Sequence, residues 1–351
     1  MTNILILGAG AMGTAFCFPP ADAGHTVRLV GTHLDAEWIE SVRKTGIHPK
    51  LKVKLPNGVS AFSHDQFGEA LGLGNELIVL GVNSAGVPWA VEQLGPLLKG
   101  TTPILMLTKG LHAQRDAIQI LPDAVRSGLA KYGIEKLAVG AIAGPCIAAE
   151  LAAGRDTTVV VAYADARLPE WIAHLLTTSH YHVRPSMDLV GVEVCAALKN
   201  FYALAVGCPS GLLAQQDPAA NRAQMHNPAA ALFTQALLEM ARFVSFLGGD
   251  QKSVMGLAGA GDLYVTCQAG RNSRTGYFLG SGLRYSEVRA THMANETVEG
   301  AELALVIGPV LERLFSLGRL DPKAFPLAKA ITDAICRDLS LRIPWTALHQ
   351  V

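Results

Sequence analysis

The residues best suited to chemistry stand in one short stretch of the second half of the chain. The segment Gly256–Cys267 reads G-L-A-G-A-G-D-L-Y-V-T-C, and Arg271 and Asn272 follow it closely. It places the carboxylate of Asp262 and the hydroxyl of Thr266 near a guanidinium and an amide, on a glycine-rich bend. A guanidinium fork matches the oxygens of a phosphate or a carboxylate. These residue types at this spacing predict a site for a small polar anion.

A second motif at the N-terminus predicts what could react with that anion. Gly8, Gly10 and Gly13 form G-x-G-x-x-G between two short apolar runs. In such a motif the first glycine permits a tight turn, the second lets the backbone approach a pyrophosphate, and the third allows close packing of helix and strand. Phosphates are then held at the start of the helix. The residues expected to contact a dinucleotide here are Gly8, Gly10, Ala11, Met12 and Gly13.

The end of the second apolar run bears on the choice between NAD and NADP. An acidic residue usually stands there when the adenosine ribose belongs to NAD. Here the sequence is V-G-T-H, and Asp35 lies further along the chain, so no carboxylate is expected to repel a 2′-phosphate. Thr32 or His33 could contact that phosphate, or both could be ordinary exposed turn residues. The sequence therefore allows NAD or NADP as cofactor.

The pattern of apolar residues divides the chain into two regions. Short aliphatic runs bounded by turns or helical stretches are typical of buried strands, and they are Asn3–Leu7, Thr26–Val30, Glu76–Val82, Pro103–Leu107, Leu137–Val139 and Thr157–Ala162. From Asp188 onward apolar residues recur at helical spacing, most clearly in Val190–Val206, Ala229–Leu247 and Glu299–Leu317. We predict an α/β protein with a Rossmann-type, doubly wound, mostly parallel sheet in residues 1–187 and an all-helical second domain in residues 188–351.

Prolines predict two irregular places. Pro19 and Pro20 stand where the first helix should continue. Because a proline inside a helix costs about 3 kcal/mol, we expect that helix to be kinked or shortened around Pro19. The stretch Pro209–Pro228, with further Gln, Asn and Asp residues, is typical of a loop.

Composition excludes several classes of partner. Lys plus Arg and Asp plus Glu both number 29 in the 351 residues, and no run of like charges occurs, so a nucleic-acid partner is not expected. No apolar run of about eighteen residues lacks Gly, Pro or charge, so no integral membrane association is expected. The N-terminus lacks the features of a signal peptide. The 6 cysteines show no paired spacing, which argues against a metal site or disulfides and favours the cytoplasm.

Four further segments extend the pattern: Thr108–Gly110, Ala143–Glu150, Gly191–Asn200 and Val298–Gly300. In this order, with G-x-G-x-x-G before them and G-L-A-G-x-G-D-L among them, they resemble the NAD(P)-dependent sn-glycerol-3-phosphate dehydrogenases over nearly the whole chain. The resemblance implies hydride transfer between NAD(P)H and dihydroxyacetone phosphate or sn-glycerol 3-phosphate, which is a step toward phospholipid precursors. A homodimer is also expected, since the helical half is rich in apolar residues.

The resemblance assigns Lys199, in an intact A-L-K-N motif, as the general acid/base. Ketone reduction needs a proton on the oxygen, and an ammonium can polarise and protonate it. In the reverse direction a neutral amine must accept the proton, and the like charge of Lys109 would favour that neutral form. Asp262 is expected to orient Lys199. Without the motif, a lysine at the end of an apolar helical stretch would be read as a surface residue that extends toward water.

The resemblance also implies binding residues. Those expected to contact the dinucleotide, besides the glycine motif, are His33, Lys109, Ala148, Arg271, Thr297 and Glu299. Those expected to contact the substrate are Lys109, Gly144, Cys146, Lys199, Asn200, Asp262, Thr266, Gly270, Arg271 and Asn272.

Two of these positions depart from the family. Cys146 and Gly270 stand where the family usually has serine, so two hydroxyl groups are missing. The alternative is therefore a reductase of another phosphorylated hydroxyketone or of a 2-keto or 3-hydroxy acid. A separate alternative is a dinucleotide sensor or interaction protein without chemistry. The complete set of catalytic residues argues against the sensor.

Overall fold

The computed structural model describes residues 1–216, 223–268 and 270–349. The chain forms two compact units, the first from residues 1–109 and 121–192 and the second from residues 110–120 and 193–351. This grouping differs from the predicted division at 187 and 188 in two places. Residues 188–192 group with the first unit, and the hairpin of residues 110–120 groups with the second. The hairpin does so because it packs against the helix Glu299–Ser316 (α14).

Within the described residues, unit 1 contains an eight-stranded sheet in the order β5-β2-β1-β6-β7-β10-β11-β12. Neighbouring strands are parallel except for β10 and β11. The order of the first six strands is that of a dinucleotide-binding Rossmann sheet, so the predicted fold class is confirmed for this unit. The strands are β1 (Asn3–Leu7), β2 (Thr26–Val30), β5 (Val59–Phe62), β6 (Leu77–Leu80), β7 (Ile104–Met106), β10 (Val139–Ala143), β11 (Thr157–Ala162) and β12 (Tyr181–Ser186), with a separate short ladder of β3 (Ile47–His48) and β4 (Val53–Lys54).

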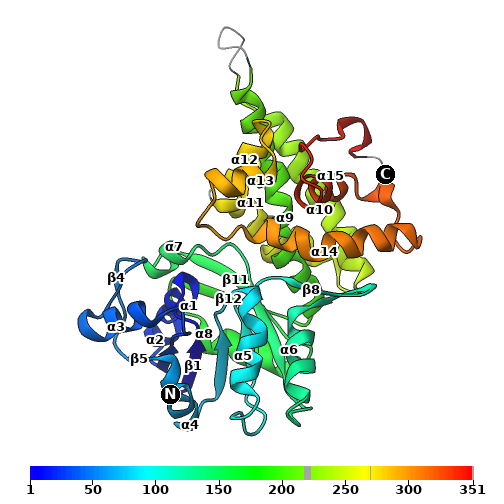
Figure 1. The fold of residues 1–351 in the computed structure, drawn as a ribbon. Helices are drawn as coiled ribbons and strands as arrows, with labels where there is room; N and C mark the ends of the chain where they lie inside the picture. The colour runs from blue at the N-terminus through cyan, green and yellow to red at the C-terminus, as the bar shows by residue number, and fades with distance from the viewer. Residues whose placement is uncertain (217–222, 269, 350–351) are drawn as a thin grey trace. The chain divides into compact units, whose positions relative to one another are not determined.

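Both faces of the sheet are buried, which is why its strands are aliphatic throughout. In β1 the alternate residues Leu5 and Leu7 face one core, and Ile4 and Ile6 face the other. Helices α5 and α6 lie together over the first of these faces (Figure 1). That face is covered by α4 (Phe67–Gly72), α5 (Val87–Leu94) and α6 (Leu121–Ala130), and the other by α1 (Ala11–Ala15), α3 (Ala36–Thr45), α7 (Ala148–Ala152) and α8 (Arg167–Leu176).

The first helix is shortened as its prolines predict. Helix α1 ends at Ala15, and α2 (Phe18–Asp22) begins three residues later with Cys17 as its N-cap. Pro19 and Pro20 therefore occupy the first turn of a new helix, where a missing N–H costs nothing.

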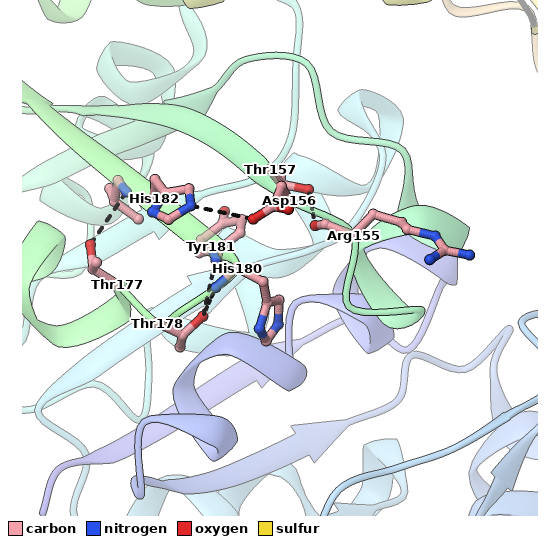
Figure 2. A network of polar contacts seen from close by, with 9 residues as sticks. Arg155, Asp156, Thr157, Thr177, Thr178, His180, Tyr181 and His182 are labelled. Carbon is pink, nitrogen blue, oxygen red and sulfur yellow. Dashed lines mark hydrogen bonds and ion pairs between the residues drawn. The ribbon is translucent and has the colours of Figure 1, made fainter.

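Strand β12 forms one edge of the sheet, and a hydroxyl network fixes its start (Figure 2). The Thr178 hydroxyl accepts a hydrogen bond from the Tyr181 N–H at 3.0 Å, and the Thr177 hydroxyl accepts one from the Val183 N–H at 3.3 Å. Between these two residues of the strand, the His182 imidazole lies 3.6 Å from the Asp156 carboxylate. Tyr181, which this network holds at the start of the strand, is buried and lines the pocket described below.

The C-terminal region of unit 2 is helical throughout its described residues, as predicted, and the unit adds one hairpin from residues 110–120. Its elements are β8 (Leu111–Gln114), β9 (Ala117–Ile120), α9 (Leu189–Ala214), α10 (His226–Phe246), α11 (Asp262–Gln268), α12 (Arg271–Gly280), α13 (Tyr285–Thr291), α14 and α15 (Pro326–Cys336), of which α9 begins within unit 1. The ion pair between Arg313 and Asp116 fastens the hairpin to α14.

The predicted loop Pro209–Pro228 is wrong at both ends. Helix α9 continues through Pro209 to Ala214, and α10 already begins at His226. The loss of one N–H at Pro209 is offset by the packing of a long buried helix. Residues 217–222 of the predicted loop lie outside the described residues.

Two helices in the described residues, α9 and α10, are long and apolar enough by composition to cross a bilayer. The relevant window of α9 is 89% buried inside the protein and that of α10 39%. A window as deeply buried as that of α9 is typical of a core helix in a soluble protein, so α9 gives only weak evidence for a membrane span.

A buried carboxylate joins three elements of unit 2. Glu239 on α10 accepts hydrogen bonds from the Tyr202 hydroxyl, the Gln235 amide and the N–H groups of Leu327 and Ala328, at 2.8 to 3.1 Å. The last two are N–H groups from the first turn of α15, where a helix favours negative charge. Burial nevertheless raises the pKa of Glu239 to about 7, against the lowering effect of these hydrogen bonds.

This pKa predicts a pH dependence of stability. The folded state binds a proton that the unfolded state releases between the ordinary carboxyl value of 4.5 and about 7. Stability from this group therefore falls as pH rises through that window, by up to about 3 kcal/mol. The Glu239→Gln variant has no carboxyl group to titrate at this position. Urea titrations give the free energy of unfolding of both proteins, and the wild-type value minus the variant value should fall between pH 5 and pH 8. Parallel pH profiles would contradict the assignment.

Candidate functional site

The glycine-rich turn of unit 1 is closely packed on one side and open on the other. A Cβ on Gly13 would lie 2.1 Å from the Gly8 carbonyl oxygen, and one on Gly8, whose φ is +114°, would lie 2.8 Å from Gly81. A Cβ on Gly10 meets no atom within 4 Å. Gly8 and Gly13 are therefore required by the fold, while Gly10 leaves open the space into which a pyrophosphate would approach. The residues present fit a dinucleotide.

A carboxylate does stand at the end of β2, contrary to the expectation for Asp35. The chain turns back after Thr32, and Asp35 Oδ2 accepts hydrogen bonds from the Thr32 N–H at 2.8 Å and the Ala9 N–H at 3.0 Å. Sequence spacing misjudged its position because residues 31–35 form a tight turn rather than an extended segment. His33 is exposed, and its ring packs edge to face with that of Trp89 at 5.6 Å.

Several predicted residues of unit 1 line one pocket at the carboxyl ends of β7 and β10. Lys109, Gly144 and Cys146 meet Met12 and the ring of Tyr181 there. The pocket encloses about 20 Å³, enough for one water-sized group. The structure thus brings together residues predicted separately for cofactor and substrate. Ala148 is the first residue of α7, outside this lining.

In unit 2 the two residues expected to act in proton transfer form a buried ion pair. Lys199 Nζ contacts Asp262 Oδ1, although the two residues are 63 positions apart. Their side chains are only 9% and 2% exposed. Asp262 begins α11 directly after one turn of π-helix, Leu257–Gly261 (η4). That turn packs tightly, since a Cβ on Gly259 would lie 2.0 Å from the Val254 carbonyl oxygen.

A network of amide hydrogen bonds begins at Asn200, the residue that follows Lys199. The Asn200 amide donates to Glu299 Oε2 at 2.8 Å, and the Asn272 amide donates to Asn200 Oδ1 at 2.9 Å. The Gly300 N–H donates to Asn272 Oδ1 at 2.9 Å. The residues predicted from three separate motifs are therefore joined in one network at the N-termini of α12 and α14.

Arg271 is the exposed cation of this network. Its guanidinium lies 3.7 Å from Glu299 Oε1, and its side chain is 44% exposed. Gly270, the N-cap of α12, has φ +134° and ψ 175°, a conformation in which a serine would be strained. The missing serine hydroxyl at this position is thus tied to the local backbone. The Thr266 hydroxyl donates to the Asp262 carbonyl at 2.7 Å, and Thr297 is half-buried just before α14, without a place in the network.

Close packing of two helices, which the sequence argument missed, holds this network together. A Cβ on Gly276 of α12 would lie 2.1 Å from the Leu204 carbonyl oxygen of α9, and one on Gly207 of α9 would lie 2.4 Å from the Ser273 carbonyl oxygen. Gly211 and Gly280 make equally close approaches. The four-residue spacing of glycine on both helices was the available signal. It allows the backbones to touch and so brings Asn272 to Asn200.

The thiol of Cys267, which feels the charge of Lys199, is chemically quiet. Burial raises the pKa of Cys267 to about 12, although the charge of Lys199 acts in the opposite direction. The thiol is therefore protonated at neutral pH, and it does not compete with Asp262 for the ammonium. In the described residues no cluster of three or more His, Cys, Asp or Glu could hold a metal ion.

Comparison with known proteins gives family matches over most of the chain. The model described as the N-terminus of NAD-dependent glycerol-3-phosphate dehydrogenase matches residues 3–168, and the model of the C-terminus matches residues 188–343. The NADP(+)-dependent glycerol-3-phosphate dehydrogenase of Archaeoglobus fulgidus is 35% identical over 284 residues, which cover 81% of this chain and 82% of that protein. The NAD(P)+ glycerol-3-phosphate dehydrogenase of Shouchella clausii is 31% identical over 334 residues, 90% and 92% of the two chains.

A solved structure agrees with these sequence matches. The crystal structure of glycerol-3-phosphate dehydrogenase from Coxiella burnetii is 27% identical, with a TM-score of 0.78, and the match covers 99% of this chain and 97% of that one. Both units are therefore similar to one full-length protein rather than to separate modules.

Proposed function

Because the chain belongs to the NAD-dependent glycerol-3-phosphate dehydrogenase family, we propose that it interconverts dihydroxyacetone phosphate and sn-glycerol 3-phosphate with NAD(P)H and that Lys199 is its general acid/base. The observation that carries the role of Lys199 is its buried ion pair with Asp262, next in sequence to the network of Asn200, Asn272 and Glu299. A paired, buried ammonium and an exposed guanidinium, whose sequence neighbours Asn200 and Asn272 are hydrogen-bonded to each other, suit a phosphorylated ketone.

The residues of unit 2 account for the proton. In reduction the Lys199 ammonium donates its proton to the ketone oxygen, while bound NAD(P)H supplies the hydride. In oxidation the neutral amine takes the hydroxyl proton. Asp262 fixes the position of Nζ and stabilises the charged form. Lys109 is proposed as the second cation toward the substrate, from its place beside Gly144 and Cys146.

Arg271 is proposed as the main phosphate contact. The side-chain amide of Asn272 already bonds Asn200 and Gly300, so its role is chiefly to fix the start of α12. The first-turn N–H groups of this ten-residue helix add donors for a phosphate. The partners are therefore a small phosphorylated substrate and NAD(P). We also propose a homodimer, supported by exposed apolar side chains of unit 2 such as Leu305 and Val306, and light scattering after gel filtration measures its mass. A cytoplasmic location is proposed from the cysteines, which lack paired spacing.

Two glycine substitutions should separate cofactor binding from folding. Gly10→Ala places a methyl group in open space, so folding should be unaffected while the Kd for NADPH rises at least about tenfold, because the pyrophosphate can no longer approach. Gly13→Ala collides with the Gly8 carbonyl and should lower the free energy of unfolding by about 1–3 kcal/mol. Fluorescence titration of NADPH and urea unfolding measure the two effects. Equal affinity for NADPH in Gly10→Ala and wild-type would remove Gly10 from the site.

Initial rates test the proposed reaction directly. The purified protein should oxidise NADH or NADPH with dihydroxyacetone phosphate, and it should be much slower with other hydroxyketone phosphates, unphosphorylated dihydroxyacetone and a panel of 2-keto acids. Comparing the two cofactors gives their order of preference. Faster turnover of keto acids than of dihydroxyacetone phosphate would refute the proposed substrate and leave the role of a dinucleotide oxidoreductase intact.

A further inference from the structure

The backbone of Ala9, inside the glycine-rich turn, is held by three side chains. Its N–H donates to Asp35 Oδ2 at 3.0 Å. Its carbonyl oxygen accepts from the Thr14 hydroxyl at 3.1 Å and lies 2.9 Å from His48 Nε2. These side chains come from the turn after β2, from α1 and from β3. Elements distant in sequence therefore converge on one residue between Gly8 and Gly10.

The three side chains are buried and their hydrogen-bonding roles are fixed. Thr14 and His48 are 0% exposed and Asp35 is 6% exposed. The Leu51 N–H donates to His48 Nδ1 at 3.2 Å, so Nδ1 carries no proton and Nε2–H donates to the Ala9 carbonyl. Burial lowers the pKa of His48, although its bond to Ala9 and the charge of Asp35 act in the opposite direction. The imidazole is therefore a neutral donor.

The carboxylate of Asp35 is committed to this turn. Oδ2 accepts from the Ala9 N–H, the Thr32 N–H and the Thr32 hydroxyl, all at 2.8 to 3.0 Å. An acid that binds the adenosine ribose instead presents its oxygens to solvent at the end of the second strand. Because only 6% of its surface is exposed, Asp35 has little carboxylate surface with which to contact a ribose.

We propose that Asp35 and His48 are positioning residues that hold the Ala9 backbone in the conformation that receives the pyrophosphate, and that Asp35 does not select between NADH and NADPH. The proposal rests on the dinucleotide site of the proposed function. A turn held in its binding conformation avoids the loss of affinity that follows when only a fraction of molecules is competent to bind. The pyrophosphate is common to both cofactors, so the effect must be common to both.

The variants that test this are Asp35→Ala, Asp35→Asn and His48→Gln, with Glu37→Gln as the matched control. Glu37 is an exposed acid of the same helix start. Asp35→Ala removes three accepted hydrogen bonds and should raise the Kd of NADH and of NADPH about tenfold each, as expected when the competent fraction falls to about one tenth. Asparagine keeps an acceptor oxygen and should largely restore both. His48→Gln should weaken the binding of NADH and of NADPH in the same proportion, and the control Glu37→Gln should change neither affinity.

Dissociation constants are measured by fluorescence titration at a temperature where circular dichroism shows each variant folded. A KM for dihydroxyacetone phosphate that is unchanged at saturating cofactor supports an effect confined to the turn. A loss confined to NADH in Asp35→Ala, or a gain confined to NADPH in Asp35→Asn, would show that Asp35 acts on the ribose and would overturn the proposal. Wild-type affinity in all variants would overturn it as well, while a wild-type protein that binds neither cofactor would refute the proposed function too.

Discussion

Lys199→Ala is expected to reduce kcat for dihydroxyacetone phosphate about 10³-fold, with the KM for the cofactor nearly unchanged. The size follows from the usual contribution of general acid–base catalysis, which lies between about 10² and 10⁴. The substitution removes the group that is proposed to protonate the ketone oxygen, and Asp262, a carboxylate, cannot replace it as a cation. Initial rates in both directions measure the effect, since the same residue must accept the proton in oxidation.

The same substitution leaves a buried charge, so folding needs its own control. Asp262 is 1% exposed, and removal of its partner should destabilise the fold by about 3–5 kcal/mol. The double variant with Lys199→Ala and Asp262→Asn removes both charges and should recover most of that stability without recovering activity. Lys199→Arg keeps a cation opposite Asp262 and should fold, but a guanidinium does not release a proton at neutral pH. If either folded variant kept more than about a tenth of wild-type kcat, proton transfer by Lys199 would be excluded, because the loss would fall below the range of acid–base catalysis.

The sequence predicted well what depends on local order along the chain. Strand β1, the glycine turn and β2 follow one another within 30 residues, and each of the three glycines in the turn has one mechanical role. The prolines at 19 and 20 likewise act on their own helix. The contact between Lys199 and Asp262 is different, because 63 residues separate them and only the resemblance to a family joined the two motifs.

The errors came from contacts that no linear pattern specifies. Asp35 was judged by its distance along the chain, but a tight turn returns its carboxylate to Thr32 and Ala9. The composition of the stretch Pro209–Pro228 predicts a loop, but α9 continues through Pro209 because burial of the surrounding helix outweighs one lost hydrogen bond. The role of the glycines in α9 and α12 is visible only when the two helices are seen packed together, because the backbone of each helix occupies the space that a side chain on the other would need.

Arg271→Ala is expected to raise the KM for dihydroxyacetone phosphate about 10²-fold or more. The guanidinium is the exposed cation at the start of α12, and its loss removes a charge-assisted, two-pronged contact worth about 3 kcal/mol. Stability should change little, because the side chain is 44% exposed and its ion pair with Glu299 spans 3.7 Å in contact with solvent. Substrate titrations at saturating cofactor, with urea unfolding alongside, measure both quantities.

The identity of the bound group is tested by changing substrate and side chain together. Arg271→Lys keeps the charge but loses the fork, so it should fall between wild-type and Arg271→Ala in its KM for the phosphorylated substrate. Unphosphorylated dihydroxyacetone offers nothing for Arg271 to bind, so its low kcat/KM should be nearly equal in all three proteins. A proportional loss for both substrates would mean that Arg271 acts on the cofactor or on the fold of α12. In that case a cation other than Arg271, with Lys109 the first to be tested, must hold the phosphate.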